Sequence, residues 1–311
     1  MKPLKFAVAI FFALAITGFT CGQTVPRPPI TGISHLSVYT TNAAKANFFY
    51  VHDLGAMKGA DPQNSTGVRY YFSPAQFIEV LPLPSGDTSI SRLDLVAYRT
   101  TDADGLRRYL AAHRIKVPTH VQHGSDGSRW LNVHDPEGNT IQFFQAPVHS
   151  AVSVPPNPLS DHIIHIGYMV HSRSAEDAFY RKLLGFRPYW YGGRTPGTTD
   201  WVSQQVPNGT DWLEYMLVPG PNQPGIPKSM SAEELGVLDH FSLGVHNMEK
   251  SVELLWAGDR LSAKHNGPQI GLDGKWQFNL FDPDGVRVEL MEFQPVVKPC
   301  CSSFTAASPT K

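Results

Sequence analysis

The chain has 311 residues, a net charge of −1 and a hydrophobic content of 41%. This composition is typical of a globular protein, and the length is sufficient for one large core or two ordinary ones. The near-neutral charge argues against nucleic acid or an anionic membrane as the main partner, because both require a basic face.

The first 22 residues predict a signal peptide. Lys2 and Lys5 precede an apolar run over residues 6–16, which is followed by small residues and is too short for a stable membrane anchor. We therefore expect a periplasmic or secreted protein without a membrane span. Cys21 leaves a lipoprotein open as the alternative to a cleaved soluble form.

Cysteine is rare, since the chain has only Cys300 and Cys301 besides Cys21. A core without cysteine does not depend on disulfides, even in an exported protein. The pair lies in residues 295–311, which we expect to form a flexible tail. The two cysteines could bond to each other, cross-link two chains or have no role, and we assign them no catalytic one.

After a linker at residues 23–30, the sequence repeats itself. The matching pairs include Phe49-Tyr50 with Phe179-Tyr180, Leu54-Gly55 with Leu184-Gly185, and Asp135-Pro136-Glu137-Gly138 with Asp282-Pro283-Asp284-Gly285. The repeat predicts two modules, at 31–147 and 161–294, joined by a proline-rich linker at 148–160.

Within the second copy, hydrophobic periodicity predicts a strand, a helix and strands, and then the same order again. The expected elements are a strand at 165–170, a helix at 174–184 with Ser174 as its N-cap and Gly185 as its stop, strands at 186–191, 200–206 and 211–218, a strand at 240–245, a helix at 248–257, and strands at 274–281 and 286–293. Each copy thus contains two βαβββ units, and the predicted fold class is α+β.

Four side chains occupy equivalent places in the two units of the second copy. His165 and His240 open the first strands, and Glu214 and Glu289 lie in the last ones. The separation from His165 to Glu214 equals that from His240 to Glu289, as pseudo-symmetry requires. A single strand histidine is more often an ordinary hydrogen-bonded residue, but related half-sheets folded against each other would bring all four together.

Neutral imidazole and carboxylate oxygen suit Fe(II), Mn(II), Ni(II), Co(II) or Zn(II). We therefore predict that His165, His240 and Glu289 bind one divalent metal ion, with Glu214 as the candidate fourth ligand. Two histidines and one carboxylate leave positions for substrate oxygens and O₂. A fourth protein ligand would leave about two positions, enough for two adjacent oxygens of a small substrate.

The first copy serves as an internal control. It has His35 and Glu79 at the first two places, but Leu93 and Gln142 at the third and fourth. Leucine cannot bind a metal and glutamine is a weak ligand. We therefore expect a metal-free first module with a structural or substrate-shaping role.

Paired βαβββ units, a histidine that opens a strand, and a turn such as Asp282-Pro283-Asp284-Gly285 before a strand glutamate resemble the vicinal oxygen chelate superfamily. This group includes glyoxalase I, extradiol ring-cleaving dioxygenases and bleomycin-resistance proteins. The resemblance implies two tandem modules, each a curved mixed sheet around a metal site. It makes His165, His240 and Glu289 the ligands, and it places Glu214 where glyoxalase I-like lyases supply a carboxylate that ligates or acts as base.

The resemblance leaves the reaction open. An inert first module beside a metal-bearing second one is the layout of extradiol dioxygenases, yet Asn279 stands where those enzymes carry a tyrosine, and residues 220–238 offer no histidine. Glyoxalase I uses a cytosolic glutathione adduct, which conflicts with export. We place lyase or isomerase chemistry first, with Glu214 moving the proton, ahead of an Fe(II) ring-cleaving dioxygenase and of a metal-free binding protein. A homodimer stays open.

Aromatic residues gather in the second copy and are candidates for the wall of a substrate pocket, although such strand residues more often belong to a core. They are Tyr189, Trp190, Tyr191, Trp201 and Trp212.

Overall fold

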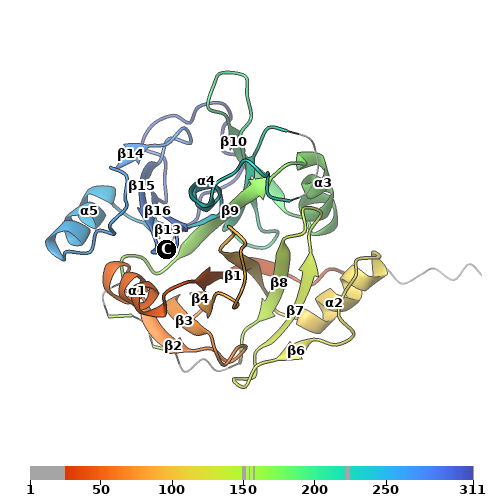
Figure 1. Cartoon of the computed structure of the whole chain (residues 1–311). Coiled ribbons are helices and arrows are strands. Elements are labelled where there is room, and N and C mark those ends of the chain that lie inside the picture. The colour runs from red at the N-terminus through yellow and green to blue at the C-terminus, as the bar shows by residue number, and fades with distance from the viewer. Residues whose placement is uncertain (1–24, 149–151, 154, 157, 221–224, 311) are drawn as a thin grey trace, which may run out of the picture.

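The computed structural model describes residues 25–148, 152–153, 155–156, 158–220 and 225–310 (Figure 1). The predicted signal peptide, with Cys21, lies outside the described residues. Among the residues that the structure describes, no helix combines the length and the apolar character needed to cross a membrane.

The first half of the chain forms two βαβββ units in sequence. The first unit consists of β1 (Ile30–Thr40), α1 (Ala43–Phe48) with its π-helical continuation η1 (Phe49–Asp53), β2 (Met57–Ala60), β3 (Val68–Ser73) and β4 (Gln76–Pro82). The second consists of β5 (Leu93–Thr100), α2 (Ala103–Ala112), β6 (Gln122–His123), β7 (Arg129–His134) and β8 (Thr140–Gln145).

The second half repeats this order with one addition. Its first unit consists of β9 (Ile163–Val170), α3 (Arg173–Asp177), the π-helix η2 (Ala178–Leu183), β10 (Arg187–Gly192), β11 (Trp201–Gln205) and β12 (Trp212–Leu217). After the added α4 (Ala232–Leu238), the last unit consists of β13 (His240–Val245), α5 (Met248–Ala257), β14 (Gln269–Ile270), β15 (Trp276–Phe281) and β16 (Arg287–Glu292).

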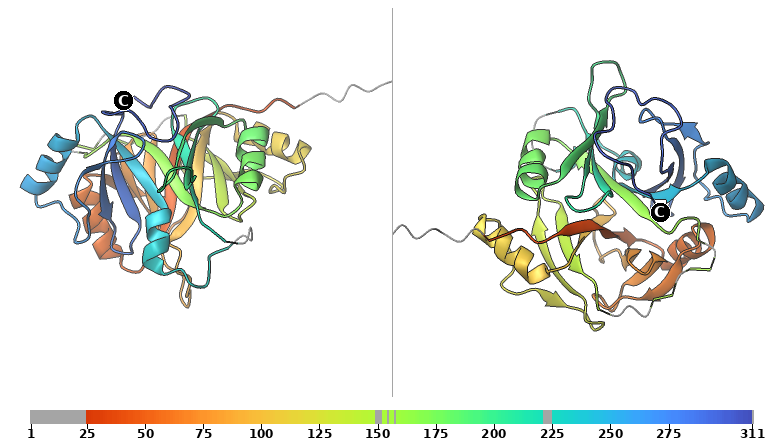
Figure 2. Two further views of the ribbon diagram at one scale, coloured as in Figure 1. Left: turned by 90° about the horizontal axis from the view of Figure 1, so that it is seen from above. Right: turned by 180° about the vertical axis from the view of Figure 1, so that it is seen from behind.

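Each half folds into one eight-stranded mixed sheet, and both sheets have the same strand order. The order is β2-β3-β4-β1-β5-β8-β7-β6 in the first half and β10-β11-β12-β9-β13-β16-β15-β14 in the second. The sheets curve and lie side by side, with α1, α2, α3 and α5 along their outer sides and α4 in the middle of the molecule (Figures 1 and 2). The predicted α+β class and the curved mixed sheet of paired βαβββ units are therefore confirmed.

The opening strands of the paired units are neighbours in the middle of each sheet. β9 runs parallel to β12 and antiparallel to β13, and β13 runs parallel to β16. This arrangement brings the strands that carry the four candidate site residues side by side.

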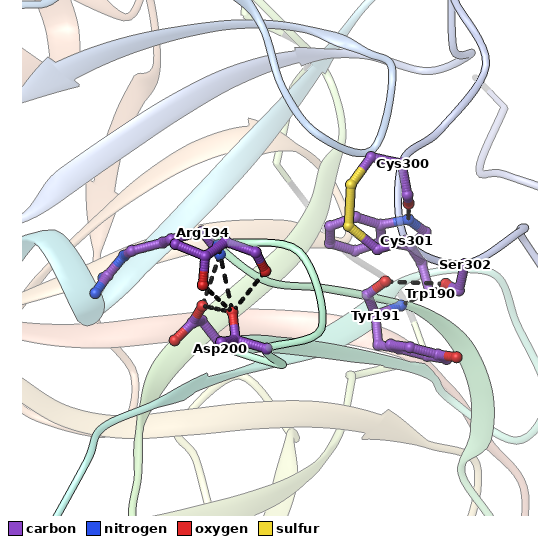
Figure 3. The surroundings of a disulfide bond; sticks show 9 residues. Trp190, Tyr191, Arg194, Asp200, Cys300, Cys301 and Ser302 are labelled. Atoms are coloured by element: carbon purple, nitrogen blue, oxygen red, sulfur yellow. Dashed lines mark hydrogen bonds between the residues drawn. A yellow bond between two sulfur atoms is a disulfide. The ribbon is translucent and has the colours of Figure 1, made fainter.

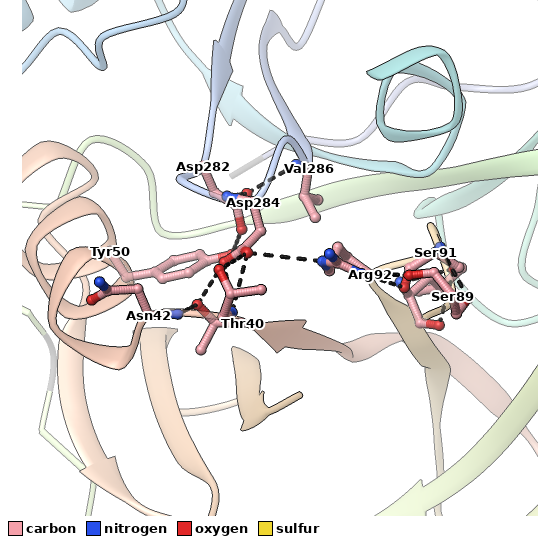
Figure 4. Close-up of polar contacts among 11 residues, drawn as sticks. Thr40, Asn42, Tyr50, Ser89, Ser91, Arg92, Asp282, Asp284 and Val286 are labelled. Carbon is pink, nitrogen blue, oxygen red and sulfur yellow. Dashed lines mark hydrogen bonds and ion pairs between the residues drawn. The ribbon is translucent and has the colours of Figure 1, made fainter. Parts of the chain in front are cut away.

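The two modules hold each other through their repeated Asp-Pro turns. Asp135 of the first module accepts hydrogen bonds from the hydroxyls of Tyr168 and Tyr180, at 3.1 and 3.2 Å. Reciprocally, Asp282 of the second module accepts one from Tyr50 at 3.2 Å, as Figure 4 shows. The repeated turn is therefore an interface element as well as a hairpin connection.

One helical prediction needs correction, and one helix was not predicted. The helix expected to begin at Ser174 begins at Arg173 after Ser172, and it widens into a π-helix from Ala178 onward. Sequence reasoning missed α4, although Ser231 and Glu234 form a capping box at its start. By contrast, the bounds of α5 match the prediction, because Asn247 accepts a hydrogen bond from the amide of Lys250 and fixes the first turn.

The expectation of a flexible tail is also corrected. In the described part of the tail, the amide of Thr305 donates to the carbonyl of Tyr189 at 3.0 Å, and the hydroxyl of Tyr189 bonds to Ser308 at 2.7 Å. Gln205 donates to the carbonyl of Ala307 at 2.7 Å. The segment thus lies against β10 and forms part of the second module.

Candidate metal centre

The candidate ligands share one face of the second sheet. Across three adjacent strands, Glu214 on β12 and His240 on β13 both lie opposite Gly167 on β9. Two residues along the strands from this row, His165 and Glu289 both lie opposite Ser242. Because residues two apart in a strand share a face, all four side chains project to the same side.

Gly167 creates the space in which these side chains meet. A Cβ atom at this position would collide with the imidazole ring of His240. Glycine is therefore required at this position because the ring approaches the backbone closely, and not because of an unusual backbone conformation.

The nitrogen and oxygen atoms converge at short distances. The Nε2 atoms of His165 and His240 lie 3.0 Å apart, and Nε2 of His165 lies 3.2 Å from Oε2 of Glu289. Oε2 of Glu214 lies 3.7 Å from Nε2 of His240. One ligand atom each of His165, Glu214 and His240 lies within 4.8 Å of the others. The structure thus brings all four predicted residues together, with Glu289 joined to the compact group through His165.

Burial keeps both imidazoles neutral. It lowers the pKa of His240 well below the ordinary range, and the charge of Arg287 lowers it further. Burial also lowers the pKa of His165, although Glu289 opposes this shift. Nδ1 of His240 donates to the carbonyl of Leu238 at 2.8 Å, which leaves the lone pair of its Nε2 facing the other ligands.

The two carboxyl groups differ in their electrostatics. Burial, reinforced by the charge of Glu289, raises the pKa of Glu214 to about 8. Burial alone would raise the pKa of Glu289 as well, but the hydrogen bond with His165 and the charge of Arg287 lower it overall. Ser203 donates to Glu214 at 3.2 Å. One glutamate is therefore stabilised as an anion, while the other tends to hold a proton.

This donor set fits a divalent cation. Two imidazole nitrogens and two carboxyl groups face one another inside the protein, and a cation that displaced the proton of Glu214 would pair with both carboxylates. Imidazole together with carboxylate is the ligand chemistry of first-row divalent metals. The His165, Glu214 and His240 group can accordingly hold such an ion.

The site opens into a cavity of about 320 Å³. Its aromatic walls include Tyr189, Trp190, Trp201 and Trp212, as the sequence predicted, together with Phe304 from the C-terminal tail. Tyr191 is not part of the wall, because it points outward and is 46% exposed. The polar lining consists of Ser203, Glu214, Gln269, Asp273, Gln277, Asn279, Arg287 and Glu289.

A buried lysine beside the cavity was missed in the sequence. Lys275 is fully buried, and its ammonium lies 4.7 Å from the ring centre of Trp212. Burial lowers its pKa to about 8. The ring of His165 also stacks on Trp212, with 4.6 Å between the ring centres. A lysine next to a glycine turn carries no sequence signal of burial, because its position depends on aromatic residues far away in the chain.

The strand register corrects one position of the first module. Leu95 lies opposite Ser37 on β1, as His240 lies opposite Gly167 on β9. The counterpart of His240 is therefore Leu95 and not Leu93, and it is again a leucine. Gln142 lies opposite Ala97 and is the counterpart of Glu289, as expected.

Residues 162–290 match the family model described as Glyoxalase/Bleomycin resistance protein/Dioxygenase superfamily. No curated protein has a sequence that matches this chain significantly. The match spans most of the second module and includes all four candidate ligands.

Solved structures with a similar fold span both modules. The 2,3-dioxygenase LapB from Pseudomonas sp. KL28 has a TM-score of 0.62 and 14% identity, over 88% of this chain and 97% of its own. Homoprotocatechuate 2,3-dioxygenase from Brevibacterium fuscum, in complex with 3,4-dihydroxyphenylacetate, has a TM-score of 0.61 and 18% identity, over 86% and 82%. A catechol 2,3-dioxygenase has a TM-score of 0.59 and 17% identity, over 88% and 96%. At these identities the likeness concerns the fold.

Proposed function

We propose that the protein is a member of the glyoxalase/bleomycin resistance protein/dioxygenase superfamily and an enzyme that depends on one divalent metal ion, and the support for the family is the match of residues 162–290 to its model. The proposed ligands are His165, His240 and Glu289, and Glu214 is the candidate for a fourth. The observation that carries the proposal is the buried convergence of imidazole and carboxylate groups at the end of an aromatic cavity. When bound, the ion acts as a Lewis acid towards two adjacent oxygens of a small substrate.

Ring-cleaving oxygenation of an aromatic vicinal diol is the reaction that we propose first, with Fe(II) as the metal. The similar structures are dioxygenases that share the tandem-module arrangement, and one of them holds a dihydroxylated aromatic acid. A cavity of about 320 Å³ with tryptophan walls suits one planar ring. For these reasons we propose the dioxygenase ahead of the lyase or isomerase that the sequence alone favoured.

The residues of the chain have distinct parts in this proposal. Trp190, Trp201 and Trp212 bound the cavity and exclude water from the substrate ring. Glu214 faces the same cavity with a pKa raised to about 8 by burial, and it is our candidate for moving a proton at its Oε2 atom. We assign proton transfer to Glu214 because this chain has Asn279 at the position where extradiol dioxygenases carry a tyrosine.

Lyase or isomerase chemistry is the second candidate, and Glu214 favours it. Its carboxylate lies 3.7 Å from Nε2 of His240, so it is close enough to serve as a fourth ligand. A site with four protein ligands has room for two substrate oxygens and less room for O₂. In this case the substrate carries an acidic C–H bond next to its oxygens, and Glu214 transfers that proton.

Metal analysis of the natively purified protein, combined with oxygen uptake, tests the proposal. Stoichiometric iron and consumption of O₂ with catechol support the dioxygenase. Nickel, cobalt or zinc, with turnover under anaerobic conditions, supports the lyase or isomerase. If the protein holds no stoichiometric metal, and His240→Ala changes nothing in its metal content, the enzyme proposal fails and a metal-free binding protein takes its place.

We also propose that the enzyme acts outside the cytosol. The support is the basic and apolar order of residues 1–22. Cell fractionation and N-terminal sequencing of the mature protein test this. A cytosolic protein that retains Met1 and the apolar run contradicts it.

A further inference from the structure

The tail segment 299–308, which we call the C-terminal strap, connects two walls of the cavity. The amide of Cys300 donates to the carbonyl of Leu272 at 2.8 Å, and the indole of Trp190 donates to the carbonyl of Cys300 at 3.3 Å. Farther along, the amide of Thr305 donates to the carbonyl of Tyr189 at 3.0 Å. Leu272, Trp190 and Tyr189 all line the cavity. The strap therefore bridges the loop before β15 and the strand β10.

The strap also contributes a wall of its own. Phe304 lines the cavity, and its ring centre lies 4.8 Å from that of Tyr189. The ammonium of Lys275 lies 5.2 Å from the ring of Phe304. Displacement of the strap would thus remove one side of the cavity and uncover a buried cation.

A disulfide between adjacent residues lies at the start of the strap. Cys300 and Cys301 are bonded to each other, and both are exposed to solvent. Figure 3 shows the pair beside Trp190, with Ser302 next to Tyr191. Tyr191 and Ser302 exchange two hydrogen bonds, of 2.9 and 3.0 Å. The disulfide is therefore directly joined to the contacts that hold the strap on β10.

The backbone at the disulfide has an unusual conformation. Cys301 has a φ of 73°, in the left-handed region that residues with a Cβ atom rarely adopt. The small ring that closes between neighbouring residues restricts this backbone. Because the bond encloses no longer stretch of chain, it contributes little to global stability through loop entropy, and its effect is local.

We propose that Cys300–Cys301 is a thiol-exchange site whose oxidised form holds the C-terminal strap across the cavity. A thiolate of a small dithiol attacks one sulfur and breaks the Cys300–Cys301 bond. The second thiol of the reagent then attacks its own sulfur in the mixed disulfide, breaks the bond to the cysteine and releases that cysteine as a thiolate. The dithiol loses two electrons and becomes a cyclic disulfide, while the two cysteines take up two protons as thiols.

Reduction then frees the strap. Once the ring is open, Cys301 returns to an ordinary φ, and the positions of Cys300 and Ser302 are no longer fixed relative to each other. The hydrogen bonds to Leu272 and Tyr191 are weakened, and the cavity opens on the side of Phe304. This inference concerns access to the cavity, and it stands whichever reaction the protein catalyses.

Hydrogen exchange measured by mass spectrometry tests the inference without a substrate or metal. The oxidised protein is compared with protein treated with dithiothreitol, and intact mass confirms the gain of two hydrogens. We expect strap amides, including that of Thr305, to exchange about tenfold faster after reduction, as the loss of roughly one hydrogen bond predicts. Peptides from β8 in the first module serve as the internal control and should not change.

A Cys300→Ser, Cys301→Ser double variant completes the design. Its strap should exchange fast with or without dithiothreitol, because it has no disulfide to reduce. The inference is overturned if the reduced wild type keeps the slow exchange of the oxidised form. It is equally overturned if the double variant is as protected as the oxidised protein.

Discussion

The two modules differ in how they place a cation near equivalent buried carboxyl groups. In both, a strand histidine stacks on an aromatic ring of the neighbouring strand: His35 on Phe77 at 4.3 Å, and His165 on Trp212 at 4.6 Å between ring centres. A cationic side chain also lies over each ring, Arg69 over Phe77 at 4.3 Å and Lys275 over Trp212 at 4.7 Å. The aromatic and imidazole frame of the site is therefore common to both copies.

The difference lies on the strand next to the glutamate. Arg69 is opposite Glu79 in the first module, whereas Ser203 is opposite Glu214 in the second. The guanidinium of Arg69 is buried and pairs with Asp61, with 3.1 Å between Nε and Oδ1. The first module thus supplies its own cation beside its carboxyl groups. The second has a small residue there, which leaves room for a cavity and for an external cation.

The largest expected effect is the loss of metal from the second module alone. We expect His240→Ala to lower the affinity for the metal by more than about 100-fold. Loss of a residue that only hydrogen-bonds to a ligand costs up to about 100-fold, and this variant removes a ligand itself. The matched control is His35→Ala, which should leave the metal content unchanged. Metal analysis after gel filtration measures both. Equal metal loss in the two variants would contradict the assignment of the site to one module.

The next effect concerns the internal cation of the first module. We expect Arg69→Ala to lower the free energy of unfolding by about 3 kcal/mol, because it leaves Asp61 buried without its partner. Urea unfolding measures the change. Arg187→Ala in the second module removes an arginine at the sheet edge and should have a much smaller effect. A loss below about 0.5 kcal/mol for Arg69→Ala would indicate that solvent replaces the ion pair.

A smaller effect separates the two glutamates at equivalent places. We expect Glu214→Gln to weaken metal binding by about tenfold, since it replaces a charged ligand by a neutral one while the other three remain. Glu79→Gln in the first module should leave metal binding unchanged. Titration of the metal-free variants with Co(II) provides the measurement. Unchanged affinity in Glu214→Gln would assign Glu214 to proton transfer alone.

The sequence contained much of the site because the repeat preserves its geometry. Equal spacing of His165, Glu214, His240 and Glu289 sufficed to place them on equivalent strands, and the sheet then brings those strands together. The counterpart of His240 was misplaced by two residues, since the pairing of β1 with β5 contains register shifts that no pattern of side chains reveals.

Other parts of the site depend on contacts between distant segments. Phe304 and Lys275 meet only because the C-terminal strap folds back on β10, and a tail rich in serine, threonine and proline shows no periodicity that would predict this. The role of Arg69 also required the register, because only the pairing with Glu79 reveals that it faces the counterpart of the metal site. Local pattern thus predicted the four candidate ligands, and tertiary packing determined the walls of the cavity.

The smallest effect tests the reciprocal turns that join the modules. Burial raises the pKa of Asp282 to about 7, so the folded protein binds a proton there that the unfolded chain releases near pH 4. Its contribution to stability is therefore full below pH 4 and declines as pH rises towards 7. In Asp282→Asn the amide keeps a partner for Tyr50 without a charge, so the decline should disappear. Relative to the wild type, the variant should gain about 1 kcal/mol in unfolding free energy between pH 6 and pH 7, measured by urea unfolding. The same difference at both pH values would show that Asp282 is ionised in the folded protein and that the turn is held by its hydrogen bonds alone.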